Sequence, residues 1–539
     1  MIVSQGTLNT ASIVVPDLYV VVVPPQNYLI NGVPTNVLGI VGTASWGPTN
    51  TPTLVSDMPS YVQAFSSPVN RKYDMGTHVA VAVQQGATNM RCVRVTDGTD
   101  TAATATSPAG CITYTALYSG SAGNSISITL STGSKTNTFR ATVGVAGGVP
   151  EIFDNVAGSG NTFWVNLAAA INNGTSANYR GASKLIAATA GAGTTAPTTG
   201  AVVTLSGGTD GSAPGSGHIT SSTLIGLDTS PRKGMYALRG QGCSIMDLCD
   251  CDDSTQWSTA DGFSTGEGVY NVITGPSGDT ISNAVTTRAT AGLDSYSSKL
   301  MLGNWVLWND PFNAVLRYVS PQGFVAGRLA NLSPEQSSLN KAMVGVVGTQ
   351  QTITTNGSTS TFSQAELQQL VLGGIDTITN PGGGGLIMWT CRIGHNSSSN
   401  AAVQGDWYTR LTNFIASSLN AGMGLFLGQP INQTMVNNVK STLTSFLMNM
   451  LGQGLLAPSV DDGGLPFSVI CNLGPATNNP PSRTKLGYLQ ADVQVQYQSI
   501  NEKFLVNLEG GQTVTVTRQA LGSASQAVTA TPQAALAST

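Results

Sequence analysis

Two apolar segments separated by a capped helix constrain the fold of this chain most strongly. Residues 37–42 form a short continuous apolar run, which is typical of a strand buried on both faces. Asp74 occupies an N-cap position before an apolar helical segment that is expected to end near Gly86. Residues 90–95 then favour a second strand. This order of strand, helix and strand predicts an α/β sheet.

The amino-acid composition changes in the second hundred residues. Residues 96–110 and 206–218 are rich in Gly, Ser, Thr and Asp, as linkers are. Between them, residues 125–132 alternate with a period of two, which favours an antiparallel strand. We therefore expect residues 99–217 to form an inserted β-rich domain on the outside of any assembly.

The last third of the chain carries the clearest helix signals. Ser363 and Glu366 have the spacing of a capping box, and the helix that they open is expected to end at Gly373. Asp406 and Asn432 are the expected N-caps of two longer helices, each with apolar residues on one face. The sequence therefore predicts three helices in this region.

Alternating strands are expected near the C-terminus. One face of the first strand carries Val493, Val495 and Tyr497, while Gln494 and Gln496 lie on the opposite face. The alternation returns further along the chain and indicates two more short strands, whose apolar residues are Phe504, Val506, Leu508, Val514 and Val516.

The N-terminal segment favours an extended arm. Residues 1–25 have no helical period, and Pro16 suits an edge or added strand better than a central one. The segment has no basic region of a signal peptide, and no apolar run in the chain reaches the roughly 18 residues of a membrane helix. We therefore expect neither secretion by a signal peptide nor insertion into a membrane.

The composition narrows the possible partners. The 539 residues are enough for three or four domains. Charged residues are 9 % of the chain, against roughly 25 % in an average soluble protein. The net charge of −4 provides no basic surface for nucleic acid. A surface so poor in charge suits a protein that is covered by copies of itself.

Catalytic and metal sites are not predicted. None of the three histidines, His78, His218 and His395, stands beside a recognisable nucleophile motif. Residues 249–253 gather cysteine and aspartate donors, but they lack the second ligand pair of a zinc site and the residue order of a calcium loop. The seven cysteines are mostly single, which favours reduced, buried thiols made in a cytosol. We expect no catalytic residue, no metal and no cofactor.

Several segments, in their order along the chain, resemble the subunit of a contractile phage tail sheath. Each segment is a weak signal by itself, but their order over about four hundred residues is more specific. They are "GIVGTASWGP" from Gly39, "WNDP" with "VSPQGFVAGRLA" from Trp308 to Ala330, "GIDTITNPGGGGLIMWTCR" from Gly374 to Arg392, and the closing strands before Gly511.

The resemblance implies an α/β (α+β) multidomain fold with a discontinuous core. The implied parts are an N-terminal extended arm (1–25), a core sheath domain (26–98 with 362–511), an inserted β-rich outer domain (99–217), a subtilisin-like α/β middle domain (218–361) and a C-terminal arm (512–539).

The resemblance also implies a function. The chain would be a structural subunit that forms stacked six-membered rings around an inner tail tube and contracts to drive the tube through the host envelope. Its partners would be further copies of itself, the tail tube protein, and the baseplate and tail terminator proteins, with no direct contact to nucleic acid. It would assemble in the bacterial host cytoplasm and belong to the virion tail.

Exchange of strands between subunits is the expected means of assembly. Strand addition relies on main-chain hydrogen bonds, so it tolerates plain side chains, and an arm of about 20 extended residues reaches roughly 66 Å. The residues expected to take part are Ile13, Val15, Leu18 and Val20 in the donated N-terminal arm, Val493, Val495, Tyr497, Phe504, Val506 and Leu508 in the receiving sheet, and Val514 and Val516 in a donated C-terminal strand.

Two alternatives remain at the level of sequence. The sheath of a phage-tail-like bacteriocin or of a secretion system is the same physical object in another context. A subtilisin-like hydrolase belongs to a different class, and the missing signal peptide and missing triad both argue against it.

Overall fold

The computed structural model describes most of the chain, and the first 498 residues form one unit. The described residues are 2–5, 19–22, 30–175, 180–215, 217–351, 354–355, 358–359, 362–380, 389–457, 464–503, 505–508 and 510. The chain divides into two units, Met1–Gln498 and Ser499–Thr539, and every helix and strand named below belongs to the first.

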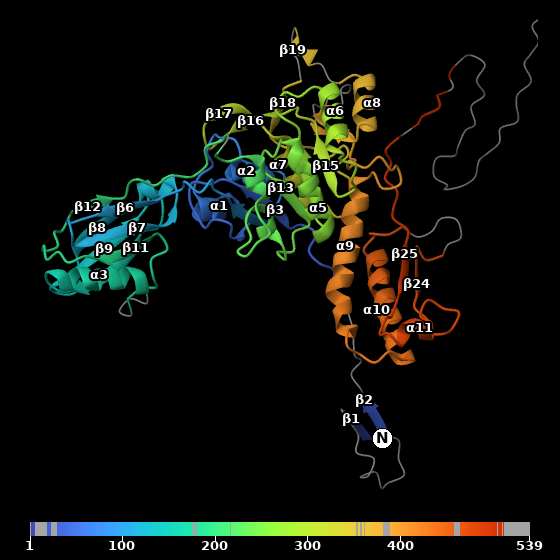
Figure 1. The fold of residues 1–539 in the computed structure, drawn as a ribbon, viewed down its shortest axis with the longest axis horizontal. Helices are drawn as coiled ribbons and strands as arrows, with labels where there is room; N and C mark the ends of the chain where they lie inside the picture. The colour runs from blue at the N-terminus through green and yellow to red at the C-terminus, as the bar shows by residue number, and fades with distance from the viewer. Residues whose placement is uncertain are drawn as a thin grey trace, which may run out of the picture. The chain divides into compact units, whose positions relative to one another are not determined.

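A seven-stranded sheet with the order β21-β15-β14-β13-β3-β5-β4 lies at the centre (Figure 1). All neighbouring strands run parallel except β4, which is antiparallel to β5. β13, β14 and β15 are buried at every position, as expected for a parallel sheet covered on both faces. The strands are β3 (Leu38–Gly42), β4 (Thr53–Val55), β5 (Met90–Arg94), β13 (Ile245–Leu248), β14 (Tyr270–Thr274), β15 (Ser298–Met301) and β21 (Ile375–Asp376).

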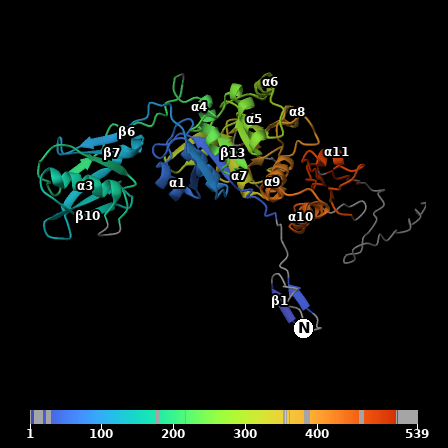
Figure 2. The same ribbon diagram turned by 60° about the horizontal axis from the view of Figure 1, so that its bottom comes forward.

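Helices cover the two faces of this sheet. Val272 of β14 packs in the cluster of α2 (Met75–Gln84) and α7 (Pro321–Asn331), whereas the next residue, Ile273, packs in the cluster of α6 (Ile281–Ala291) and α8 (Gln364–Leu372). Figure 2 shows α7 on one side of β13 and α5 (Trp257–Glu267) on the other. The centre therefore has three layers, helices on both sides of one sheet. The remaining short helices are α1 (Met58–Phe65) and α4 (Ser221–Ile225).

The sheet differs from the division expected from the sequence. The resemblance places residues 26–98 and 218–361 in different domains, whereas β3 pairs with β13 from Leu38↔Ile245 onward. The apolar runs identify each strand correctly, but a short buried strand carries no signal for which neighbour it will pair with.

The inserted domain, residues 99–217, has two sheets and a core of its own. Its sheets have the orders β10-β9-β8-β12 and β11-β7-β6. Phe153, Trp164 and Tyr114 are among the largest side chains buried in its core. The elements are β6 (Ala102–Thr106), β7 (Ile112–Ser119), β8 (Ser127–Thr132), β9 (Thr138–Gly144), β10 (Glu151–Ala157), α3 (Asn161–Asn173), β11 (Ile186–Ala190) and β12 (Val202–Thr204).

A buried arginine and a carboxylate fasten the inserted domain to the central sheet. Arg94 is fully buried at the end of β5, and its guanidinium donates to the carbonyls of Gly47 at 2.8 Å and Ser119 at 2.7 Å. Asp210 Oδ2 accepts from Arg71 Nη1 at 2.5 Å, so the segment that returns from the insertion is held as well. Both connections of the insertion are therefore tied to the core by charged groups.

The C-terminal domain, residues 406–498, combines long helices with a two-stranded sheet. α9 (Asp406–Met423) and α10 (Gln433–Gly452) pack against β24 (Phe467–Ile470) and β25 (Asp492–Val495), and α11 (Pro481–Thr484) lies between these strands in the chain. The predicted caps of α8 and α10 are confirmed, because Ser363 and Glu366 form a capping box and Asn432 accepts from the Met435 amide.

The predicted cap of α9 is wrong. Gly405 is the N-cap, and Asp406 is the first helical residue, fully buried. Its carboxylate accepts from the Ser338 amide at 3.1 Å instead of from the amides of its own helix. A tertiary contact has therefore replaced the local one.

Smaller sheets complete the described structure. β16 (Val306–Asp310), β17 (Val315–Val319) and β18 (Val346–Thr349) form one sheet, and β1 (Ile2–Gln5) and β2 (Tyr19–Val22) form another. Two short pairs are β19 (Thr354–Thr355) with β20 (Ser358–Thr359) and β22 (Ile378–Thr379) with β23 (Thr390–Cys391). None of the helices described is both long and apolar enough to cross a membrane.

Candidate functional site

The order of the central strands marks one place where a ligand site is expected. The chain runs outward from β3 to β5 on one side, and from β13 through β14 to β15 on the other. In open α/β sheets, the crevice at the carboxyl ends of the strands where the order reverses is the usual ligand site. Here that crevice lies between β3 and β13.

A histidine between two carboxylates occupies this position. His78 of α2 lies with its Nδ1 2.8 Å from Asp247 Oδ2 and its Nε2 3.1 Å from Asp250 Oδ1. All three residues are buried. Burial alone lowers the pKa of His78, but the charges of Asp247 and Asp250 outweigh it and hold that pKa well above its ordinary value. The imidazole is therefore a charged ion-pair partner and has no free nitrogen to act as a base.

The nearby thiol is equally unsuited to chemistry. Cys249 is fully buried, and burial raises its pKa to about 12 although the charge of His78 opposes the shift. A thiolate, not a thiol, is the nucleophile in cysteine catalysis. The Cys249–His78 pair thus lacks both an activated nucleophile and a free base.

The loop that precedes α2 closes this crevice. The Tyr73 amide donates to Asp250 Oδ2 at 2.9 Å, and Lys72 Nζ lies 2.8 Å from Asp252 Oδ2. A Cβ placed on Gly42 would come within 2.9 Å of Cys249 Sγ and of Tyr73 O. Backbone and side chains of the protein therefore fill the space that a ligand would need.

The aspartates and cysteines of residues 249–253 do not form a metal site. Asp250 and Asp252 are used by His78 and Lys72, and Asp253 caps the short turn after it by accepting from the Thr255 amide. Within the described ranges, no group of three or more potential ligands could hold a metal ion.

A second buried charge group joins α9 to the central sheet. Lys299 of β15 is fully buried, with its Nζ 2.6 Å from Asp376 Oδ2 and 3.5 Å from Asp406 Oδ2. Burial alone lowers the pKa of Lys299, but the charges of Asp376 and Asp406 outweigh it and raise the pKa well above its ordinary value. Sequence patterns missed this group, because an isolated lysine in a strand carries no signal of its distant partners.

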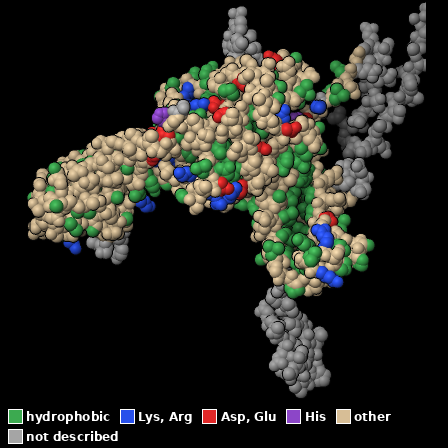
Figure 3. All heavy atoms as spheres, viewed as in Figure 1, with side chains coloured by type: hydrophobic (Ala, Val, Ile, Leu, Met, Phe, Trp, Pro, Cys, Tyr) green, Lys and Arg blue, Asp and Glu red, His purple; other side chains and the backbone are tan. Residues whose placement is uncertain are grey.

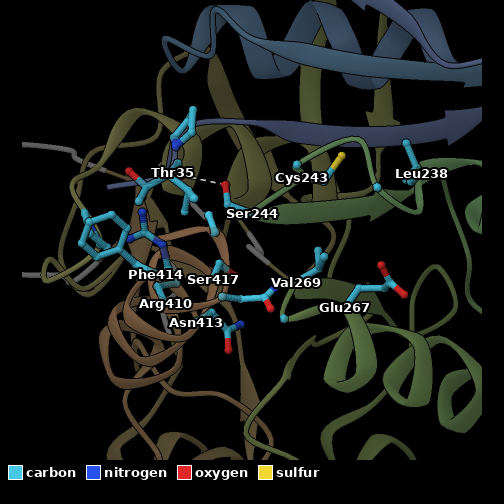
Figure 4. A pocket seen from close by; sticks show the side chains of 18 residues that line it. Thr35, Leu238, Cys243, Ser244, Glu267, Val269, Arg410, Asn413, Phe414 and Ser417 are labelled. Atoms are coloured by element: carbon cyan, nitrogen blue, oxygen red, sulfur yellow. Dashed lines mark hydrogen bonds between the residues drawn. The ribbon is translucent and has the colours of Figure 1, made fainter. Parts of the chain in front are cut away.

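A cavity of about 440 Å³ lies at the opposite, amino-terminal ends of the strands (Figure 4). α9 contributes Arg410 and Phe414 to its lining, and the segment before β13 contributes Cys243 and Ser244. Arg410 is committed to the carbonyls of residues 329, 332, 333 and 336, and Ser244 Oγ donates to the Thr35 carbonyl. These two polar side chains of the lining are therefore already paired within the protein and are not free to bind a ligand.

The sheet of β24 and β25 is only partly covered within the C-terminal domain. None of its eight strand residues is buried, although Val493 and Val495 face the apolar cluster of α9 and α10. Tyr497 packs beside them, and its hydroxyl lies 3.0 Å from Thr412 Oγ1. Apolar side chains that face a core but stay half exposed indicate that this core is incomplete in one chain.

The other predicted interaction residues lie beyond this sheet. Val506 and Leu508 are 65 % and 91 % exposed and lie in no strand of the single chain, so the strand expected there is not found. Val20 lies in β2. The predictions for Ile13, Val15, Leu18, Phe504, Val514 and Val516 concern residues outside those that the structure describes.

Comparison with known proteins gives a likeness in structure only. No family model matches the sequence, and no curated protein matches it either. Among solved structures, the chain is similar to the sheath tail protein of Desulfitobacterium hafniense at 13 % identity and a TM-score of 0.56, covering 84 % of this chain and 93 % of that one. It is similar to the sheath tail protein of Listeria innocua at 15 % identity and a TM-score of 0.56, covering 81 % and 88 %.

A third likeness extends over nearly the whole chain. The contracted sheath of an extracellular contractile injection system, PVC, is similar at 11 % identity and a TM-score of 0.52, covering 94 % of this chain and 99 % of that one. The fold is therefore that of contractile sheath proteins, a class that includes sheath tail proteins and the sheaths of injection systems.

Proposed function

We propose that this protein is the structural subunit of a contractile sheath. The observation that carries the proposal is the likeness of the fold to sheath proteins over 81–94 % of the chain. The closed crevice at His78, which offers no activated nucleophile, supports a structural role and argues against a hydrolase.

The finer function follows the resemblance found in the sequence. Copies of the chain form stacked six-membered rings around an inner tail tube, held by strands that the arms of neighbours add to the β24–β25 sheet. Contraction is a rigid-body rearrangement from a metastable extended state to a compact one, which drives the tube through the host envelope. The tube, baseplate and terminator proteins are the partners, and assembly takes place in the bacterial cytoplasm.

The buried polar junctions support movement of the subunit as one body. Arg94 and Asp210 hold the inserted domain, and Lys299 with Asp406 holds the start of α9. Charge-assisted contacts that exclude water fix the angle between parts more firmly than a flexible linker does. The moving joints are then left to the arms and to the contacts between subunits.

The likenesses support the alternative context as well. The likenesses include sheaths of the PVC and the anti-feeding prophage, both at TM-scores of 0.52, beside two sheath tail proteins. A sheath of a phage-tail-like bacteriocin or injection system therefore stands beside the phage tail as a setting for the same subunit.

Electron microscopy of the purified full-length protein tests the proposal. We expect hollow, striated cylinders to form without a partner, or in the presence of tube and baseplate proteins where a template is required. Uniform small particles under both conditions would contradict the sheath assignment.

A further inference from the structure

A lysine and two carboxylates meet inside this protein. Lys299 Nζ lies 2.6 Å from Asp376 Oδ2 and 3.5 Å from Asp406 Oδ2, and all three side chains are 0 % exposed. Lys and Arg side chains are seen at the surface in Figure 3, as is usual for these residues, whereas Lys299 is completely enclosed. An amine and a carboxyl group held together away from water are the two reactants of amide formation.

We propose that Lys299 and Asp376 condense to an isopeptide bond, an amide between the Lys299 side-chain nitrogen and Asp376 Cγ, and that Asp406 transfers the proton in this reaction. The bond forms within one folded chain. It goes beyond the proposed function and does not depend on it, because the three residues lie together in a single subunit.

The central sheet brings the two reactants together. β15 and β21 are neighbouring parallel strands, with Leu300 opposite Ile375 and Met301 opposite Asp376. Lys299 stands two residues before Met301, so its side chain leaves the same face of the sheet as that of Asp376. β21 has only two residues and lies at the edge of the sheet, so the amide would fasten a very short edge strand.

Main-chain donors hold the Asp376 carboxyl group in one orientation. Its Oδ1 accepts from the amides of Thr377 at 2.7 Å and Ile393 at 3.0 Å, and its Oδ2 accepts from the Gly394 amide at 2.9 Å. Amides aimed at a carbonyl oxygen stabilise the negative charge that develops when a nucleophile adds to the carbon. Oδ1 is then the oxygen kept in the amide, and Oδ2, which faces Lys299, leaves as water.

Asp406 has the position and the free lone pairs of a proton carrier. Its Oδ2 accepts from the Ser338 amide at 3.1 Å and from the Ser338 hydroxyl. Among the residues that the structure describes, Asp406 Oδ1 is buried and has no hydrogen-bond partner. An unpaired carboxylate oxygen beside an amine is suited to general acid–base catalysis.

The reaction balances without any further reactant. The raised pKa of Lys299 means that the site begins with one ammonium and two carboxylates. One proton passes from Lys299 to Asp376 and leaves a neutral amine and a neutral carboxylic acid. The amine attacks Cγ, Asp406 takes a proton from the nitrogen and gives it to Oδ2, and the bond from Cγ to Oδ2 breaks to release water. The site carries one net negative charge before and after.

Proximity compensates for the small amount of neutral amine. Groups held in the right geometry react as if at an effective concentration of about 10⁵–10⁸ M. The bond also needs to form only once in the life of each chain, so a slow reaction is sufficient.

Peptide mapping of the full-length protein, denatured after folding, tests the bond. Trypsin does not cleave after an acylated lysine, so residues 289–317 are expected in one peptide, joined to residues 342–392, with the loss of one water. The map is needed because an Asp-Gly pair, such as Asp97-Gly98, also loses one water when it cyclises. Recovery of 289–299 and 342–392 only as separate peptides would overturn the proposal.

The chain itself contains a matched control. Lys72 Nζ lies 2.8 Å from Asp252 Oδ2, but this lysine is 36 % exposed. Trypsin is expected to cleave after Lys72, and the resulting peptides are expected to be unlinked. A link at Lys72 in equal amount would show that proximity alone forms the bond, and it would overturn the mechanism.

Two variants test the roles of the residues. Asp406→Asn keeps the size of the side chain but removes the proton carrier, and it is expected to slow the appearance of the linked peptide by about a hundredfold or more. Lys299→Arg keeps a cation and is expected to give unlinked peptides only. Both are measured in protein that unfolds cooperatively in urea, and the map of the natural protein decides the bond without any variant. Equal rates in Asp406→Asn and the natural protein would overturn the role of Asp406.

Discussion

The inserted domain and the C-terminal domain both extend from the central sheet, but they cover their strands to different degrees. In β7 of the inserted domain, every second residue from Ile112 to Ala116 is buried in a core that the domain supplies itself. In β24 and β25 of the C-terminal domain, the side chains that face the core stay half exposed. The first domain is complete within one chain, and the second is not.

On the proposed function, this difference is the one expected between a domain on the outside of an assembly and a domain that holds it together. A core that is closed within one chain gains little from a neighbour, whereas a half-covered sheet gains apolar burial and main-chain hydrogen bonds when strands are added. On the proposed function, we therefore expect the assembly interface in the C-terminal domain.

The largest expected effect is on assembly. Deleting residues 1–25 is expected to leave a folded subunit that forms no cylinders, because the β24–β25 sheet loses its donated strand. Replacing residues 102–208 with a short Gly-Ser linker is expected to leave cylinders intact, since Thr101 and Thr209 exchange main-chain hydrogen bonds at 3.2 and 3.1 Å and hold the ends together. Electron microscopy of both variants shows whether cylinders form. Loss of cylinders on excision of the insertion, in a protein that still folds, would reverse the comparison.

The next effect is on stability. Lys299→Met removes the cation whose Nζ lies 2.6 Å from Asp376 Oδ2 and 3.5 Å from Asp406 Oδ2, and leaving a buried charge unpaired costs about 3–5 kcal/mol of unfolding free energy. Arg140→Met in the inserted domain breaks a pair whose cation is exposed, and Asp154 keeps its hydrogen bonds from Ser134 and Asn155, so the change is expected to cost about 0.2–1 kcal/mol. Urea unfolding of both variants, made in the chain without residues 1–25, measures the two losses of unfolding free energy. Equal losses would show that burial does not separate the two pairs.

The smallest effect is the dependence of stability on pH. The raised pKa of His78 gives stability that is complete below its unfolded pKa of about 6.5 and is lost as the pH rises through the folded pKa. Burial raises the pKa of Asp250, but His78 lowers it by more, so the net pKa is below its ordinary value. The Asp250 carboxylate therefore contributes stability above about pH 3.9, and this stability is lost as the pH falls through the folded pKa. The contribution of this group is therefore largest between about pH 4 and 6.5.

The neutral triple variant His78→Gln, Asp247→Asn, Asp250→Asn tests this dependence. The natural protein is expected to lose stability more steeply than the variant from pH 6.5 upward, by up to about 1.4 kcal/mol for each unit of pKa shift. Thermal or urea unfolding across pH 3 to 10 gives the two curves. Parallel curves would mean that His78 carries no charge in the folded state.

The candidate sites show what a single chain's sequence could predict. The N-caps Asp74 and Asn432 and the capping box of Ser363 were predicted correctly, because capping depends on residues three positions apart. The closed crevice was not predicted, because His78 and Asp247 are 169 residues apart and nothing in either segment specifies the other. The sequence predicts no role for His78, and only the tertiary structure shows that both of its ring nitrogens are paired with carboxylates.

The local features of this protein can be predicted from short stretches of its sequence. These are the buried strands, the capped helices and the β-rich character of residues 99–217, all of which rest on periods and caps that span a few residues. The tertiary structure alone decided that β3 joins β13 in one sheet and that Asp406 serves Lys299 instead of capping α9. It also decided that the core over β24 and β25 stays open. Pairing between distant strands and burial of charges depend on contacts far apart in the chain, and local patterns carry no information about them.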